Sequence, residues 1–312
     1  MVSLVIPIHN RGELLPRLLR SLRRIEGCKV ELVFVDNNSD AGTLRTLQTF
    51  IDEVKDDNLT IRLLRETKPG SAAARNCGLD AATGDYIYFF DSDDEISPNM
   101  LGEAEKLAAK EGADIVALQI NYAWHDGRVR PRHMTRSLDP CRHLVGNNFA
   151  TQSLFLRRDF ALKYARWNES LFYWNDFEWA FRILLCSPKV AWLPGTWHKV
   201  YRHSDSITGS RFADSVDKIL AAHRAIEEDI SADVPGSIVS DSSFQVACLK
   251  ALNCRKALYA GYVKHEGDSD AAHIIYNSIE GSVHSLIDRV RLPLLYRLSA
   301  WGLPGVWRLA IL

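Results

Sequence analysis

Over the first 120 residues, short runs of apolar residues alternate with longer amphipathic stretches. Five of these runs have the length and the β-branched or aromatic content of buried strands, and they occupy residues 2–8, 30–36, 59–65, 85–91 and 114–120. Between them, apolar residues recur at helical spacing, as the leucines do between positions 14 and 22. This alternation predicts an α/β fold with a mostly parallel sheet flanked by helices. Ser97 and Pro98 predict the start of the helix that runs toward Glu111.

The pattern changes after residue 120 to shorter, mixed segments. The elements expected there are a hairpin, a helix and two short strands, over residues 123–130, 174–185, 189–194 and 199–203. Beyond about residue 213, apolar residues follow helical spacing to the end of the sequence. We therefore expect a sheet domain over residues 1–212 and a helical C-terminal region over residues 213–312.

Composition excludes several classes of protein. The 312 residues are 46% hydrophobic and 25% charged, which is typical of a folded globular chain. The net charge of -1 gives no global reason to expect a nucleic-acid partner. The six cysteines form no CxxC pair, which argues against a zinc knuckle and favours a reduced, cytoplasmic location. The first apolar run breaks at Pro7 and lacks a basic segment, so it predicts a strand, not a signal peptide.

A run of acidic residues, DSDD at 91–94, directly follows the fourth expected strand. Its three carboxylates would repel one another unless a cation or hydrogen-bond donors compensated them. Hard oxygen ligands at the end of a strand suit Mg²⁺ or Mn²⁺ that holds a phosphate-bearing substrate. The alternative is a solvated acidic turn in which Asp94 or Ser97 caps the next helix. We call residues 91–94 the acidic run.

Two further segments follow strands at the edge where ligands bind in open α/β sheets. Asp36 ends the second strand, and its carboxylate could accept hydrogen bonds from a ribose or a base edge, or could simply form a turn. Gly70 precedes a helix that carries Arg75 and Asn76 one turn from its start. The exposed backbone amides and the guanidinium there suit the binding of a diphosphate. The alanines of this helix have a second explanation, because small residues allow close packing on the sheet. Both interpretations can hold together.

Four segments in order, VIPIHN, VDNNSD, PGSAAARN and YFFDSDD, resemble the inverting family 2 glycosyltransferases of the GT-A fold. The resemblance covers roughly the first two-thirds of the chain. It implies a nucleotide-sugar donor, most often a UDP-sugar, an Mn²⁺ or Mg²⁺ ion, and a glycan or lipid-linked acceptor in cell-surface polysaccharide synthesis. The implied donor contacts are Pro7, His9, Asn10, Asp36, Gly70, Arg75, Asn76, Asp91, Ser92 and Arg202. The implied metal contacts are Asp91, Asp93 and His203.

Two later segments match the same family. In WNDFEWAFRIL, Asp176 occupies the position of the catalytic base, while Asn175 replaces the glutamate that usually precedes it. Asp176 also favours the start of a helix through the helix dipole, a role that is compatible with catalysis. In VYRHSDSIT, His203 stands three residues before Ser206, as in the family's metal or diphosphate contact. A lone histidine is otherwise more often a structural hydrogen-bonding group. Tyr201 is, with Arg202, a second-rank candidate for the same pocket.

The tail, residues 282–312, differs in character from the rest. It contains four arginines and one aspartate among leucines and two tryptophans. This mixture suits helices lying in a membrane interface, here the cytoplasmic face of the inner membrane, or a tail packed on the sheet domain or on a second subunit of a homo-oligomer. Pro293 and Pro304 are expected to break any long helix. The apolar stretches are too short or too charged to cross a bilayer.

Two other functions compete with transfer of a sugar. The first is a non-catalytic module that binds nucleotide sugars, and the intact acidic run and Asp176 argue against it. The second is a sugar-1-phosphate nucleotidyltransferase, which would also use a parallel sheet, a metal and a nucleotide. That enzyme would need a glycine-rich, basic triphosphate loop after the first strand, where the sequence reads HNRGELL. Release of pyrophosphate instead of a nucleoside diphosphate would favour it.

Overall fold

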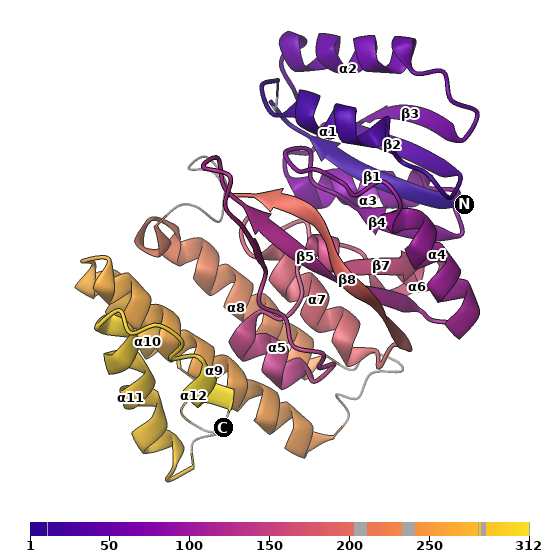
Figure 1. Cartoon of the computed structure of the whole chain (residues 1–312). Coiled ribbons are helices and arrows are strands. Elements are labelled where there is room, and N and C mark those ends of the chain that lie inside the picture. The colour runs from indigo at the N-terminus through magenta and orange to yellow at the C-terminus, as the bar shows by residue number, and fades with distance from the viewer. Residues whose placement is uncertain (11, 203–210, 233–240, 280, 282–284, 312) are drawn as a thin grey trace. The chain divides into compact units, whose positions relative to one another are not determined.

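The computed structural model describes residues 1–10, 12–202, 211–232, 241–279, 281 and 285–311 (Figure 1). The chain forms two compact units. The sheet unit comprises Met1–Met134, Ala150–Phe172 and Pro188–His203, and the helical unit comprises Thr135–Phe149, Tyr173–Ser187 and Ser204–Leu312. The domain boundary expected between residues 212 and 213 stays a prediction.

The sheet unit is built on one mixed sheet. Its strands are β1 (Val2–Ile8), β2 (Val30–Asp36), β3 (Leu59–Arg65), β4 (Tyr86–Phe89), β5 (Ile115–Ala123), β6 (Val129–Pro131), β7 (Leu154–Arg157) and β8 (Val190–Tyr201). The strand order is β3-β2-β1-β4-β7-β5-β6, with β8 paired to β5. The pairs among β1, β2, β3 and β4 are parallel, as is β5 with β8, whereas β7 runs antiparallel to β4 and β5. The expected α/β fold with a mostly parallel sheet is therefore confirmed.

Helices cover both faces of this sheet. They are α1 (Leu15–Leu22), α2 (Ala41–Glu53), α3 (Ser71–Ala81), α4 (Met100–Glu111) and α6 (Arg158–Tyr164). Alternate side chains of β1 and β2 form one core with α1, α2 and α4. The side chains between them face α3, where a Cβ added at Gly78 would meet the side chains of Val5 and Val35. The small residues of α3 thus allow the close packing expected from the sequence.

Two local expectations for the sheet unit were wrong. The segment expected to form two short strands is the single strand β8. Pro194 and Gly195 form a bulge in it, where the pairing of β8 with β5 shifts register between Leu118 and Gln119. Helix α4 begins at Met100, with Asn99 as its N-cap. Ser97 does not cap it, because its Oγ accepts a hydrogen bond from the backbone N–H of His198 at 2.9 Å.

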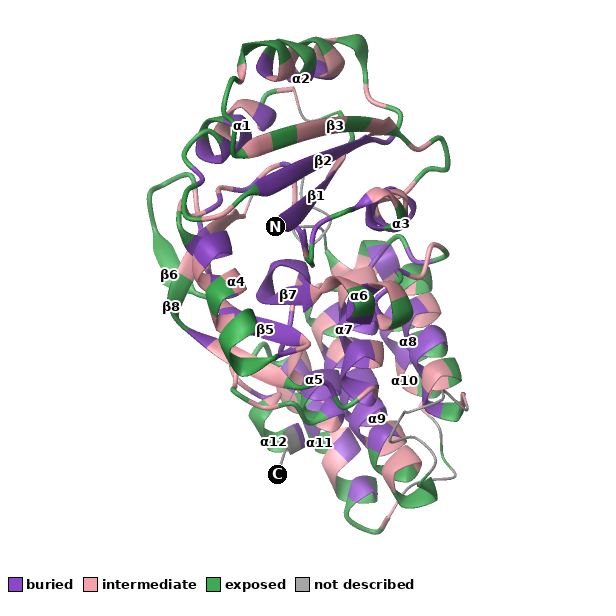
Figure 2. Cartoon of the chain, turned by 90° about the vertical axis from the view of Figure 1, so that its right-hand side faces the viewer, coloured by how far each residue is buried: buried purple, intermediate pink, exposed green. Residues whose placement is uncertain are grey.

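The helical unit contains the helices α5 (Pro140–Gly146), α7 (Asn175–Leu185), α8 (Val216–Ser231), α9 (Ser242–His265), α10 (Ser269–Asn277), α11 (Asp288–Ala300) and α12 (Arg308–Ile311). The long helix α9 packs against α5, α8, α10 and α11, and it is largely buried from Ala251 to Val263 (Figure 2). Pro293 lies inside α11 without ending it, contrary to expectation. The buried Leu292 and Leu295 hold this helix on both sides of the proline. Over the described residues, no helix combines the length and the apolar composition that crossing a bilayer requires.

Candidate functional site

Three neighbouring strands of the sheet unit deliver polar residues to one edge. Strand β1 leads into His9 and Asn10, β2 ends at Asp36, and β4 leads into Asp91. Because β1 is parallel to both β2 and β4, their carboxyl ends meet at the same edge. The sequence predicted this gathering of side chains, and the structure confirms it. This is the edge at which open α/β sheets bind ligands.

Asn37 connects the loops along this edge, and sequence reasoning missed it. Its Nδ2 donates to the carbonyls of Glu66 at 2.9 Å and Lys68 at 2.7 Å, and its Oδ1 accepts from the N–H of Gly70 at 2.8 Å. Asn37 is 5% exposed. One buried amide therefore fixes the loop after β3 and the start of α3 relative to β2. The only sequence signal is the polar run after β2, whose residue types are typical of a turn.

The residues after β1 are held by the loop after β2. The Nδ1 of His9 lies 2.7 Å from the carbonyl oxygen of Asn37, and the Oδ1 of Asn10 accepts from the N–H of Asp40 at 2.7 Å. Asp36 is 4% exposed, and its Oδ1 accepts from the N–H of Ser39 at 2.9 Å. Asp36 thus forms the turn that the sequence allowed. Its contact with a nucleoside stays a prediction.

Two of the expected donor contacts have backbone roles. Pro7 lies within β1, where it is paired with Val35 of β2. Gly70 precedes α3 with φ +123°, a conformation that side-chain-bearing residues rarely adopt. A Cβ at Gly70 would also lie 3.1 Å from the ring of Phe172. Glycine is therefore required here for the geometry of the loop.

Arg75 links α3 to the acidic run. Its Nη2 lies 2.7 Å from the Oδ1 of Asp91, and its guanidinium lies 4.3 Å from the ring centroid of Trp167. The side chain of Arg75 is 6% exposed and that of Asp91 34%. A buried guanidinium thus compensates the first carboxylate of the run from one side, while the carboxylate keeps part of its surface accessible.

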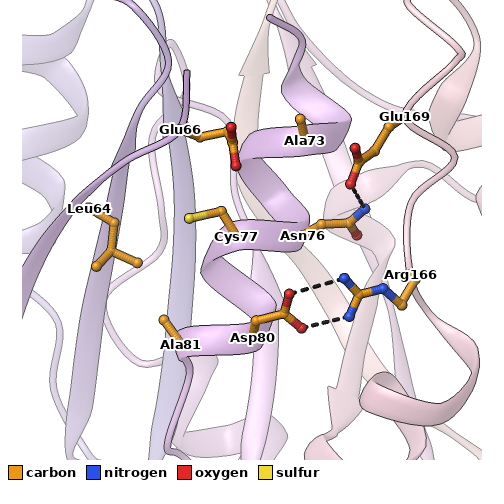
Figure 3. A pocket seen from close by; sticks show the side chains of 9 residues that line it. All are labelled: Leu64, Glu66, Ala73, Asn76, Cys77, Asp80, Ala81, Arg166 and Glu169. Atoms are coloured by element: carbon orange, nitrogen blue, oxygen red, sulfur yellow. Dashed lines mark hydrogen bonds and ion pairs between the residues drawn. The ribbon is translucent and has the colours of Figure 1, made fainter. Parts of the chain in front are cut away.

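Asn76 points to a different neighbour. Its Oδ1 accepts from the N–H of Trp167 at 2.8 Å, and its Nδ2 donates to Glu169 at 2.7 Å. Asn76 therefore fastens α3 to the segment after α6. It also lines a surface hollow whose other residues are Leu64, Glu66, Ala73, Cys77, Asp80, Ala81, Arg166 and Glu169 (Figure 3). Of the expected donor contacts, this hollow includes Asn76 alone.

Asp94 is a buried structural group and not a helix cap. It is 2% exposed, its Oδ2 accepts from the Nε2 of Gln152 at 2.6 Å, and its Oδ1 accepts from the N–H of Tyr201 at 2.7 Å. Burial raises the pKa of Asp94 well above its usual value, and the charges of Asp93 and Asp91 raise it further. The last carboxyl of the run thus favours its neutral form and ties the loop after β4 to the end of β8.

A second polar contact lies beneath this loop. The hydroxyl of Tyr88 donates to the carbonyl of Gln152 at 2.7 Å and lies 2.6 Å from the Nε2 of His198. Burial lowers the pKa of His198 to about 3, so this imidazole is neutral at physiological pH. Gln152 and His198 were not recognised in the sequence, because their partners lie tens of residues away along the chain.

Asp91 and Asp93 are the residues of the acidic run that could contact a divalent ion. Within the described part of the chain, no three His, Cys, Asp or Glu residues are grouped to hold a metal. Mg²⁺, however, is often held by one or two carboxylates together with substrate phosphates and water. Asp91 and Asp93 are partly exposed, whereas Ser92 and Asp94 are buried. The donor set fits an ion that arrives with a diphosphate.

Arg202 extends the end of β8. Its N–H donates to the carbonyl of Ala123 at 2.8 Å, and its guanidinium lies 5.2 Å from the ring centroid of Tyr122. Just before it, the ring of Tyr201 lies 3.6 Å from the guanidinium carbon of Arg17, whose Nη1 donates to the carbonyl of Asp93 at 3.3 Å. His203 and Ser206 lie outside the described residues.

Asp176 belongs to the helical unit, where it is the second residue of α7. Trp174 precedes the helix in the left-handed conformation, with φ 54°. Asp176 is partly exposed and lies in the first turn, where the helix dipole favours a negative charge. The helix expected over this segment is confirmed, and the role of Asp176 as a base stays a prediction.

Arg255 of α9 is a buried cation close to this helix. It is 1% exposed, and its guanidinium carbon lies 3.7 Å from the ring centroid of Phe177 and 4.3 Å from that of Trp174. Burial lowers the pKa of Arg255, while the charge of Asp176 opposes that shift. A guanidinium stays protonated in proteins, so Arg255 places a fixed positive charge within electrostatic reach of Asp176.

Solved structures share the fold. The TarS protein of Staphylococcus aureus, solved with UDP-GlcNAc, superposes with a TM-score of 0.62 at 16% identity, covering 89% of this chain and 90% of that one. The mannosyltransferase PcManGT of Pyrobaculum calidifontis, solved with GDP-Man and Mn²⁺, superposes with a TM-score of 0.57 at 17% identity, covering 96% of this chain and 86% of that one.

Sequence comparison gives the family. An uncharacterized glycosyltransferase of Haemophilus influenzae is 28% identical over 162 residues, which are 51% of this chain and 63% of that protein. The chain thus spans less than two thirds of that relative's length. The family model described as Glycosyl transferase family 2 matches residues 3–173, more than half of the 312 residues. The chain therefore belongs to glycosyl transferase family 2.

Proposed function

We propose that this chain transfers a sugar, with inversion, from a nucleoside diphosphate sugar to a hydroxyl of a glycan or lipid-linked saccharide. The donor we favour is a UDP-sugar, and the process is cell-surface polysaccharide synthesis in the cytoplasm. Family membership supports the reaction class, and the UDP-GlcNAc and GDP-Man bound by the two solved neighbours support the class of donor.

The observation that carries this proposal is the part-exposed Asp91, fixed by Arg75 at the carboxyl end of β4. Asp36, His9 and Asn10 lie at the same edge of the sheet. A set of oxygen and nitrogen groups held in place by hydrogen bonds is preorganised, so it orients a bound nucleotide without first rearranging. In this proposal, the ribose and the diphosphate bind along this edge.

A divalent ion would be held by Asp93 and Asp91 together with the donor's phosphates. When bound, Mn²⁺ or Mg²⁺ would neutralise negative charge on the departing nucleoside diphosphate. The Mn²⁺ reported for PcManGT supports this choice of cofactor. The residues of the chain position the leaving group, and Arg75 keeps Asp91 in one orientation.

Asp176 would take the proton from the acceptor hydroxyl as that hydroxyl attacks the anomeric carbon. The new bond forms on the face opposite the departing diphosphate, so one displacement inverts the configuration and needs no covalent enzyme intermediate. A positioned general base typically contributes ~100- to 10,000-fold to the rate. The first turn of α7 and the charge of Arg255 both favour the ionised carboxylate that this role requires.

The test is to incubate the purified chain with a panel of nucleotide sugars, with Mn²⁺, with Mg²⁺ or with EDTA. We expect slow release of a nucleoside diphosphate from one donor, and a loss of that release in EDTA. Asp93→Asn is expected to act like EDTA, whereas Asp126→Asn, in the exposed turn after β5, serves as the matched control. Release of pyrophosphate would favour a nucleotidyltransferase instead. Donor binding with no turnover under any condition would favour a non-catalytic module.

A further inference from the structure

Exposed apolar side chains are concentrated near the end of the chain. Among the described residues, 14 large hydrophobic side chains are exposed. Half of them lie in the last stretch, and they are Leu286, Ile287, Val290, Leu294, Trp301, Leu303 and Leu309. Single exposed apolar residues are normal on a protein surface, but a contiguous group marks an interaction site. We call these seven residues and the arginines among them the tail surface.

Helix α11 is apolar on two faces. Leu292, Leu295 and Ser299 recur at a spacing of three and four and are buried, on the helix that packs against α9. Ile287, Val290 and Leu294 recur at the same spacing but are 65%, 70% and 45% exposed. The second apolar stripe is therefore not needed to hold α11 in the helical unit.

The tail surface is hollowed. Its hollow has a volume of about 480 Å³ and is lined by Leu286, Ile287, Val290, Arg291, Leu294, Leu295 and Leu309. Leu286 precedes α11, and Leu309 comes from α12. Residues from both helices and from the loop before them thus line one apolar depression, so the surface is wider than a single helix face.

The described part of the tail carries exposed basic groups and no exposed acid. Arg289, Arg297 and Arg308 are exposed. Asp288 is the one acidic residue between positions 285 and 311. It is 5% exposed, its Oδ2 accepts from the N–H of Ser285 at 2.9 Å, and it lies 3.7 Å from the Nζ of Lys250. The tail surface is therefore positive, although the chain as a whole has a net charge of -1.

From this juxtaposition we infer that the tail surface binds the face of an anionic lipid bilayer, with α11 lying in the plane of the interface. An apolar stripe would enter the boundary of the acyl chains, while the flanking arginines reach anionic headgroups. A second copy of the chain is disfavoured as the occupant. In a two-fold dimer the same surface meets itself, which would bring arginines against arginines with no exposed carboxylate of the tail surface to pair them.

The experiment measures co-sedimentation of the full chain with vesicles of mixed phosphatidylglycerol and phosphatidylcholine, and with vesicles of phosphatidylcholine alone. We expect binding to the anionic vesicles, weakening as salt is added, and much weaker binding to the neutral ones. Failure to sediment with anionic vesicles at low salt would overturn the inference.

Three variants separate the contributions. The apolar triple Ile287→Ser/Val290→Ser/Leu294→Ser and the basic triple Arg289→Gln/Arg297→Gln/Arg308→Gln are each expected to weaken binding roughly 100-fold. The matched control Val246→Ser/Ile274→Ser changes exposed apolar residues of α9 and α10 in the same unit, and it should bind like the wild type. Wild-type binding by both triples would also refute the inference.

Further measurements keep the test decisive. Circular dichroism and thermal melting establish that each triple is folded. Should the apolar triple fail to fold, the exposed Trp301 provides a milder probe, because brominated lipids should quench the wild type more than Trp301→Phe. Equal quenching of the two proteins would count against contact at this surface. Sedimentation equilibrium examines the rival occupant, since a dimer that the apolar triple abolishes while vesicle binding persists would assign the tail surface to a second copy.

Discussion

The Nη2 of Arg75 lies 2.7 Å from the Oδ1 of Asp91, so a buried cation on α3 holds the first carboxylate of the acidic run. The pair joins two segments that are 16 residues apart in the chain. It also compensates the first of the three carboxyl groups that follow β4.

Removing the guanidinium should cost stability as well as function. We expect Arg75→Met to lower the free energy of unfolding by roughly 1–3 kcal/mol, because Asp91 loses its partner while remaining largely covered. Urea denaturation measures this change. Asp80→Asn is the control, because it removes the exposed pair with Arg166, where both side chains are about half exposed, and should cost about 0–1 kcal/mol. Equal losses in the two variants would contradict a special role for the Arg75–Asp91 pair.

Asp176→Asn should separate chemistry from donor binding. We expect transfer to fall by ~100- to 10,000-fold, because the acceptor proton loses its base. Calorimetry should find the donor affinity unchanged. Asp270→Asn is a matched control, because Asp270 is also the second residue of its helix, α10, and is exposed. If transfer and donor affinity fall together in Asp176→Asn, Asp176 is not the base.

The stability of the chain should decrease with rising pH because of Asp229 in α8. Burial is the main cause that raises the pKa of Asp229 to about 8, and the charge of Glu178 adds to it. Since an unfolded aspartate titrates near pH 3.9, the folded state holds more protons between these values, and the free energy of unfolding falls as pH rises through that range.

The slope should be up to about 1 kcal/mol per pH unit. Urea midpoints across this range measure it, and Asp229→Asn should flatten the profile and stabilise the chain at the alkaline end. Asp217→Asn, an exposed acid in the first turn of the same helix, should leave the profile unchanged. A profile that keeps its slope in Asp229→Asn would show that another group is responsible.

Gly261→Ala should loosen α11 from α9. A Cβ at Gly261 would lie 2.5 Å from the carbonyl oxygen of Tyr296 and would also meet Ser299, so the two helices would have to separate. We expect a loss of about 1–3 kcal/mol, the usual cost of overpacking. The thermal midpoint measures it. Gly281→Ala, with nothing within 4 Å of its added methyl, is the control and should be nearly neutral.

Much of the fold could be predicted because its signals are local. The buried strands β1, β2 and β3 coincide with the apolar runs, and the carboxyl ends of parallel strands necessarily share an edge. The helix that carries Asp176 follows from the spacing of its aromatic residues.

The remaining features depend on distant partners. Nothing near Asp94 in the sequence indicates that Gln152 and the N–H of Tyr201 will bury it. Asn37 is of a residue type that is common in turns. Its role appears only when the loops after β2 and β3 are adjacent. Pro194 and Gly195 normally end a strand, but the bulged pairing with β5 accommodates them. Tertiary contacts override local propensity at each of these positions.

The arrangement of the acidic run changes the electrostatics that a diphosphate meets. A formal count gives residues 91–94 three negative charges. Arg75 offsets the charge of Asp91, and burial raises the pKa of Asp94, so the net negative charge of the acidic run is smaller than this formal count. A polyanionic ligand approaching the end of β4 therefore experiences less repulsion than the primary structure suggests.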